Sequence, residues 1–126
     1  MADERKRVGD EVEEAVSAYL EAKGHRILAR NWRAGHLELD IVSLDLDGVH
    51  FVEVKTRRPP LQLDPQECVT LPKQKRTAKA AAAFLARSRN PHLTDCECHF
   101  DVAAVVKSGE NIEIRFFPDA FIPIFI

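Results

Sequence analysis

The chain has 126 residues, of which 45% are hydrophobic and 30% charged, and its formal net charge is −2. These values predict one globular domain over residues 1–126 and exclude a disordered chain and a global basic field. The sequence has no apolar run of about 18 residues, which excludes a membrane-spanning helix, and no apolar segment follows the charged N-terminus. We therefore expect a soluble cytoplasmic protein whose three cysteines stay reduced.

A helix is the first element that the sequence predicts. Apolar residues recur at helical spacing over residues 9–23, and Gly24 is a typical C-terminal stop. Three strands are predicted next, over residues 25–32, 37–44 and 49–55. The short turn that ends in Gly48 separates the last two of these strands and predicts that they form a hairpin.

The second half of the chain predicts a loop, a helix and two more strands. Three prolines within residues 57–66 predict the loop. Thr70 is a suitable N-cap, and Pro72 a suitable first-turn residue, for a helix that ends near Arg87. The two strands are expected over residues 99–106 and 112–117. The apolar tail, residues 121–126, is expected to pack on its own domain, with a homodimer interface as the alternative.

Both faces of the hairpin strands carry apolar residues. In the second strand, Leu39 and Ile41 are expected to oppose Val42, and in the third strand Val52 is expected to oppose Phe51. Strands that are apolar on both faces are typical of a sheet covered by helices on each side. The fold class predicted is therefore α/β, with a central mixed sheet of about five strands flanked by helices.

Charged side chains interrupt this apolar sheet. Glu53 and Lys55 are two residues apart at the end of the third strand, so both point to one face. Glu38 and Asp40 share a face of the neighbouring strand by the same alternation. Burying such charges costs free energy unless they pair or bind a cation. A divalent-metal site is the expected reason for this pattern.

The ligand types favour Mg²⁺ or Mn²⁺, because hard cations prefer carboxylate and water oxygens. Asp40 and Glu53 are the expected ligand pair, and the backbone carbonyl of Val54 is a further expected ligand. Lys55 would orient or help to deprotonate a water, or would hold phosphate oxygens. A metal-bound water directed at a phosphodiester is a hydrolytic centre.

Asp40 is followed after about a dozen residues by Glu53-Val54-Lys55. This pattern resembles the signature of the PD-(D/E)xK nuclease superfamily, to which Holliday-junction resolvases belong. More closely, the chain resembles the YraN family of endonuclease-like proteins over most of its first three-quarters. The segments that carry this resemblance are Gly9 with Glu13 and residues 19–24, 26–33, 38–42, 51–57, 69–70, 73–74 and 100–102.

The resemblance implies a restriction-endonuclease-like fold and a metal-dependent nuclease that acts on DNA, including branched or structured DNA. Asp40, Glu53 and Lys55 match the catalytic positions. Glu13 matches an acid that many resolvases place beside the metal, and Gln74 matches a polar residue on the following helix. Two alternatives remain: a non-catalytic nucleic-acid-binding module of the same fold, and a protein-interaction domain that uses the apolar tail.

Basic residues follow the third strand and begin the second helix, and they are expected to hold DNA phosphates. They are Arg57, Arg58, Lys73, Lys75 and Arg76. Cations at a helix N-terminus oppose the helix dipole, which favours a binding role over a merely solvated helix start.

The remaining metal-binding residue types give weaker signals. Cys96 and Cys98 have one spacer between them and no second ligand pair, so partly buried thiols are expected rather than a zinc site. Four scattered histidines are expected to be surface residues. They are His25, His36, His50 and His92.

Overall fold

The computed structural model describes residues 2–57 and 69–122, with the backbone alone described for residues 2–5. The elements in chain order are α1 (Ala2–Ala22), β1 (Arg26–Ala34), β2 (Leu37–Asp45), β3 (Gly48–Arg57), α3 (Leu71–Arg87), the 3-10 helix η1 (Pro91–Asp95), β4 (Cys98–Ser108) and β5 (Asn111–Phe117). The strands form one five-stranded sheet in the order β1-β2-β3-β4-β5. Only the β3–β4 pair is parallel, so the predicted mixed sheet is confirmed.

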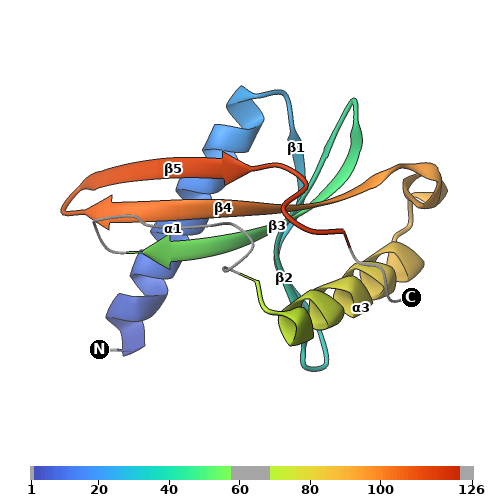
Figure 1. Ribbon diagram of the computed structural model, residues 1–126, viewed down its shortest axis with the longest axis horizontal. Coiled ribbons are helices and arrows are strands. Elements are labelled where there is room, and N and C mark those ends of the chain that lie inside the picture. Colours follow the sequence, from blue (N-terminus) through green and yellow to red (C-terminus); the bar gives the residue numbers. More distant parts are fainter. Residues whose placement is uncertain (1, 58–68, 123–126) are drawn as a thin grey trace.

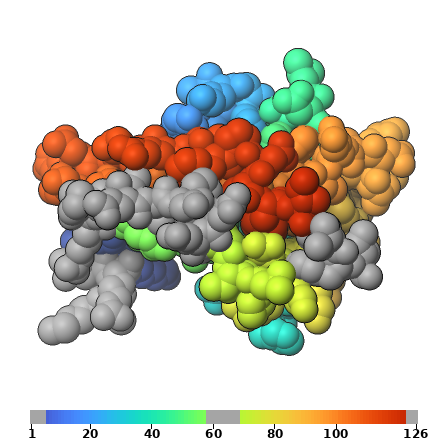
Figure 2. All heavy atoms as spheres, in the orientation of Figure 1, coloured from blue at the N-terminus to red at the C-terminus, as the bar shows by residue number. Residues whose placement is uncertain are grey.

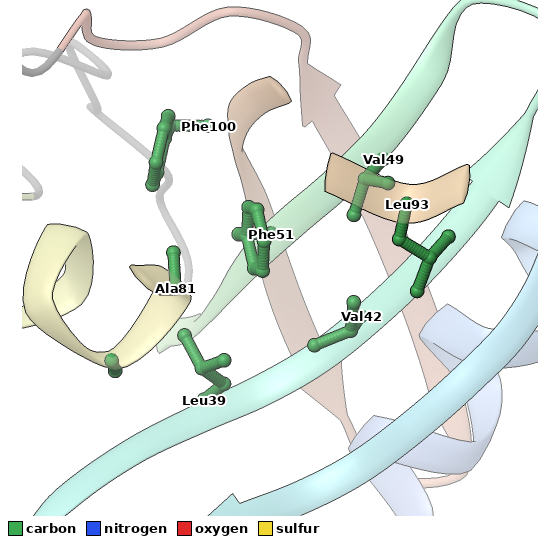
Figure 3. Close-up of a cluster of buried hydrophobic side chains, with 8 residues drawn as sticks. Leu39, Val42, Val49, Phe51, Ala81, Leu93 and Phe100 are labelled. Carbon is green, nitrogen blue, oxygen red and sulfur yellow. The ribbon is translucent and has the colours of Figure 1, made fainter. Parts of the chain in front are cut away.

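The helices α1 and α3 cover opposite faces of this sheet (Figure 1). On the α1 face, Val16 and Leu20 pack with Ile41 and Val52. On the α3 face, Ala80 and Ala81 pack in a second cluster whose larger members are drawn in Figure 3; these include Leu39, Val42, Val49, Phe51 and Phe100. The prediction of an α/β domain with a sheet between helices is therefore confirmed.

Local signals located α3 more accurately than α1. The hydroxyl of Thr70 accepts a hydrogen bond from the Lys73 amide at 3.4 Å, and α3 ends at Arg87 as predicted. The helix α1 begins at Ala2 rather than at Gly9. The added residues 2–8 are charged except for Ala2 and Val8, so they carry no apolar periodicity that would reveal the helix.

The alternation of side chains in β2 departs from the prediction. Leu39 and Val42 pack on the α3 face, whereas Ile41 packs on the α1 face, so Leu39 and Ile41 do not share a face. The break lies at Asp40. Opposite it in the register between β1 and β2 is Asn31, whose φ of 50° is left-handed and interrupts the pleat of β1.

The β2–β3 hairpin is confirmed. In its turn the Asp45 carboxylate accepts hydrogen bonds from the amides of Asp47 and Gly48, at 2.9 and 3.2 Å. Gly48 has a φ of 140°, and a Cβ there would overlap the backbone carbonyl of Glu97. Glycine is therefore required both for the backbone conformation and for the approach of the chain before β4.

The start of the apolar tail packs on its own domain. The rings of Phe121 and Phe100 have centroids 5.3 Å apart, whereas Ile122 is exposed. Residues 123–126 and most of the predicted loop over residues 57–66 lie outside the described residues. Among the described helices, none is long and apolar enough to cross a membrane.

Candidate functional site

Strands β2 and β3 separate at the predicted site. Their register ends at the pair Ile41–Val52, and beyond it the carboxylate of Asp40 accepts a hydrogen bond from the Val54 amide at 2.9 Å. A side-chain oxygen thus takes the place of a backbone carbonyl in the ladder. This contact fixes the Asp40 carboxylate against β3, beside the residue expected to supply a carbonyl ligand.

Glu53 is buried on the α3 side of β3 and lies between two lysines. Its Oε1 is 3.3 Å from Nζ of Lys55 and 3.6 Å from Nζ of Lys73, which belongs to the first turn of α3. The carboxylate is only 10% exposed, and its charge is offset by these two ammonium groups. Lys73, which we expected to hold DNA phosphates, therefore lies at the carboxylate site itself.

Asp40 has no such ion pair among the described contacts, and its acidity is strongly altered. Burial and the nearby charge of Glu53 raise the pKa of Asp40 to about 7, although the Val54 amide and Lys73 act in the opposite direction. A proton on one carboxylate, or a cation between the two, would relieve the repulsion between Asp40 and Glu53. An oxygen-ligand pair of this kind fits Mg²⁺ or Mn²⁺ by donor chemistry.

Glu13 approaches the same region from α1. The Asn31 side-chain amide donates a hydrogen bond to its carboxylate at 2.6 Å. Burial raises the pKa of Glu13 despite this bond, and Glu13 in turn contributes a smaller electrostatic effect to the raised pKa of Asp40. Asn31 thus combines a left-handed backbone with a contact to a predicted site residue, a combination often found at functional sites. The sequence pattern had not singled it out.

Several of the other predicted site residues have no described contact with Asp40 or Glu53. The Gln74 amide donates to the Val69 carbonyl at 3.0 Å, and no contact described in the structure joins Gln74 to Asp40 or Glu53. Arg57 donates to the Thr56 carbonyl at 3.0 Å. Lys75 and Arg76 are exposed on the first turns of α3, which reach the surface in Figure 2 (yellow-green). Arg58 lies outside the described residues.

A second cluster at the β2–β3 turn contradicts the prediction that His25 and His50 are surface residues. His50 is buried and His25 is half-buried. The donor atoms of His25, Asp45 and His50 all lie within 4.8 Å of one another, close enough to share one metal ion. The five-residue spacing of Asp45 and His50 across a turn was a signal in the sequence, but the position of His25 depends on tertiary packing.

The electrostatics of this cluster differ between its histidines. Burial lowers the pKa of His50, but hydrogen bonds to Asp101 and Asp45 outweigh it and raise the value to about 8. Burial and the neighbouring charge of His50 lower the pKa of His25. His50 is therefore the more basic of the two histidines and His25 the less basic one.

Comparison with known proteins identifies relatives over nearly the whole chain. The chain is 41% identical over 120 residues to a UPF0102 protein of Bacteroides thetaiotaomicron, covering 95% of this chain and 96% of the relative. It is 44% identical over 120 residues to UPF0102 protein CT2262 of Chlorobaculum tepidum, covering 90% and 91%. Among solved structures it is similar to Pyrococcus furiosus SfsA in complex with Ca²⁺, with a TM-score of 0.41 and 14% identity over 90% of this chain and 63% of that chain.

The family model described as "Uncharacterised protein family UPF0102" matches residues 12–105. This range contains α1 from Val12 onward, the hairpin and both carboxylates of the candidate site. The predicted resemblance to the YraN family is confirmed by this match. The chain belongs to the UPF0102 family.

Proposed function

We propose that the protein is a Mg²⁺- or Mn²⁺-dependent nuclease of restriction-endonuclease-like fold that hydrolyses phosphodiester bonds in DNA, with branched or structured DNA as the substrate class. The observation that supports this proposal is the partly buried position of Asp40 near buried Glu53: burial, together with the charge of Glu53, raises the pKa of Asp40 to about 7. A folded protein bears such repulsion at a cost, and perturbed acids of this kind are typical of functional sites. The adjoining ammonium of Lys55 supplies the third element of a hydrolytic centre.

In this mechanism Asp40, Glu53 and the Val54 carbonyl would hold the ion. The bound ion would polarise the phosphoryl oxygens and make a water more acidic. Lys55 would position the attacking water or a phosphate oxygen, since its Nζ already lies 3.3 Å from Glu53. Lys73, whose Nζ lies 3.6 Å from Oε1 of Glu53, would be a second cation available to a phosphate oxygen.

The remaining residues would support this centre. Glu13, held by Asn31, would supply a further carboxylate near Asp40, and Gln74 would act from α3. The basic residues that end β3, follow it in the sequence or begin α3 would hold the DNA backbone. They are Arg57, Arg58, Lys75 and Arg76.

Incubation of the protein with linear, nicked and four-way DNA in Mg²⁺ or Mn²⁺ tests the proposal. We expect cleavage that falls at least about 100-fold in Glu53→Gln and in Lys55→Met, because each removes a group that acts on the reacting atoms. Glu110→Gln and Lys23→Ala, at exposed positions outside the site, should cleave normally. If every substrate stays intact with both ions, the protein is not a nuclease of this kind.

A non-catalytic DNA-binding module is the second candidate. The observation that favours it is that the ammonium groups of Lys55 and Lys73 both lie close to the Glu53 carboxylate and offset its charge without an ion. This function predicts DNA retention that weakens with salt and needs no divalent cation. A Lys75→Ala/Arg76→Ala variant should retain less DNA at low salt, and an absence of retention by the native chain would exclude this candidate.

A further inference from the structure

The His25, Asp45 and His50 cluster is separate from the proposed nuclease centre. His50 precedes Glu53 by three residues in β3, which is about 10 Å along a strand. Asp45 ends β2 at the turn, and His25 follows the C-terminal end of α1. The cluster therefore lies at the turn end of the hairpin, and any ion bound there would be distinct from one held by Asp40 and Glu53.

Each histidine has one ring nitrogen held in place and the other directed at Asp45. Nδ1 of His50 lies 2.7 Å from the fully buried carboxylate of Asp101, and its Nε2 lies 2.7 Å from Oδ1 of Asp45. Nδ1 of His25 lies 2.9 Å from the hydroxyl of Ser43, and its Nε2 lies 3.4 Å from Oδ2 of Asp45.

Histidines that bind metal ions in proteins typically have one ring nitrogen on the metal and the other in a hydrogen bond, and His25 and His50 have their ring nitrogens arranged in the same way. Such histidines almost always use the second ring nitrogen for a hydrogen bond to a carboxylate or another polar oxygen, which fixes the tautomer and the ring. Asp101 serves His50 in this way, and Ser43 serves His25. The third donor is oriented as well, because the amides of Asp47 and Gly48 both donate to Asp45.

We propose that His25, Asp45 and His50 form a binding site for Zn²⁺ or a similar transition-metal ion, with a fourth position open to water. Two imidazoles and a carboxylate are ligands that Zn²⁺ accepts in tetrahedral geometry. Ligand atoms at 2.0–2.1 Å from such an ion lie roughly 3.3 Å apart. The three donors here already lie within 4.8 Å of one another, so movements of about 1 Å would complete the site.

The competing state is a proton on Nε2 of His50. A protonated His50 would bridge Asp45 and Asp101 as a cation, and the cluster would then serve only to hold the hairpin turn to β4. The two states predict different behaviour toward added metal. The proton bridge would not bind Zn²⁺ tightly, whereas the proposed site would exchange that proton for the ion.

Calorimetric titration of the chelator-treated full chain with Zn²⁺, and absorption spectra with Co²⁺ as a probe, test the proposal. We expect one ion per chain and affinity that falls at least about tenfold in His25→Ala and in Asp45→Asn. Asn retains an oxygen acceptor for the turn amides, so the fold of Asp45→Asn should be preserved. The exposed histidines His36 and His92 provide matched His→Ala controls that should bind normally.

The other outcomes of this experiment are equally definite. A native chain that fails to bind Zn²⁺ at micromolar concentration would overturn the proposal. So would unchanged binding in His25→Ala and Asp45→Asn, or binding that is lost only in Cys96→Ser/Cys98→Ser. Asp40→Asn should leave Zn²⁺ binding intact, so this result does not depend on whether the protein cleaves DNA.

Discussion

The partly buried carboxylate of Asp40 lowers the stability of the folded protein while it supplies a proposed metal ligand. Its pKa is about 7 in the folded protein against an ordinary value of 3.8, so between these two pH values the folded chain binds a proton that the unfolded chain has lost. The free energy of unfolding of the metal-free protein should therefore fall with rising pH, by up to about 1.4 kcal/mol per pH unit in this window. Above pH 7 the folded protein carries the full destabilisation that comes from ionising Asp40.

The Asp40→Asn substitution should remove this cost. The Asn side-chain oxygen can still accept the Val54 hydrogen bond, but no charge opposes Glu53. We expect the variant to be about 2–4 kcal/mol more stable than the native chain at pH 8 in chelator, and equal to it near pH 4. Urea unfolding at both pH values measures this difference.

Asp95→Asn, at an exposed acid in η1, is the control and should show no such gain. Added Mg²⁺ should stabilise the native chain at pH 8 and have less effect on Asp40→Asn, because an ion that binds only the folded state stabilises it. A loss of stability in Asp40→Asn at pH 8 would show that the carboxylate is not under the repulsion inferred here.

At the scale of elements, local chemistry predicted most of the fold. Turn residues around Gly48 predicted the hairpin, and Thr70 with Pro72 predicted α3. The left-handed conformation of Asn31 could not be predicted from the sequence, since asparagine also occupies ordinary strand positions. The break in alternation at Asp40 was therefore not predictable, although Asp40 and Glu53 themselves were named from their spacing.

The turn between β2 and β3 carries the most demanding backbone position. Gly48→Ala should place its methyl group against the Glu97 carbonyl in addition to forcing a side chain into a φ of 140°. We expect a loss of about 2–4 kcal/mol of unfolding free energy, from overpacking and backbone strain together. Chemical denaturation of the two proteins measures it.

Gly109→Ala is a control for a positive φ without crowding of the added methyl group. Gly109 also has a positive φ, of 62°, but an added Cβ there meets nothing within 4 Å. This variant should lose only the backbone contribution, about 1–2 kcal/mol. Equal losses in both variants would mean that the approach of Glu97 to the hairpin turn is readily relaxed.

On the scale of the whole molecule, the sheet separates the apolar cluster under α1 from the apolar cluster under α3, and these two clusters share no residue. Leu20 belongs to the cluster under α1, and Leu39 to the cluster under α3. Composition and length predicted one globular domain, but not the pairing register that brings His25 to Asp45 and His50, because that register depends on contacts between segments far apart in the chain. The prediction of a single domain requires that both clusters unfold together.

Leucine truncations on the two faces test this requirement. Leu20→Ala and Leu39→Ala should each lose about 2–5 kcal/mol of unfolding free energy, because each leaves a cavity beside buried neighbours. Leu46→Ala, at a fully exposed turn residue, should lose almost nothing. If the sheet couples its faces, both buried variants will shift one and the same urea transition, with coincident near- and far-ultraviolet circular dichroism. Two separated transitions would mean that α1 and α3 cover parts of the sheet that unfold independently.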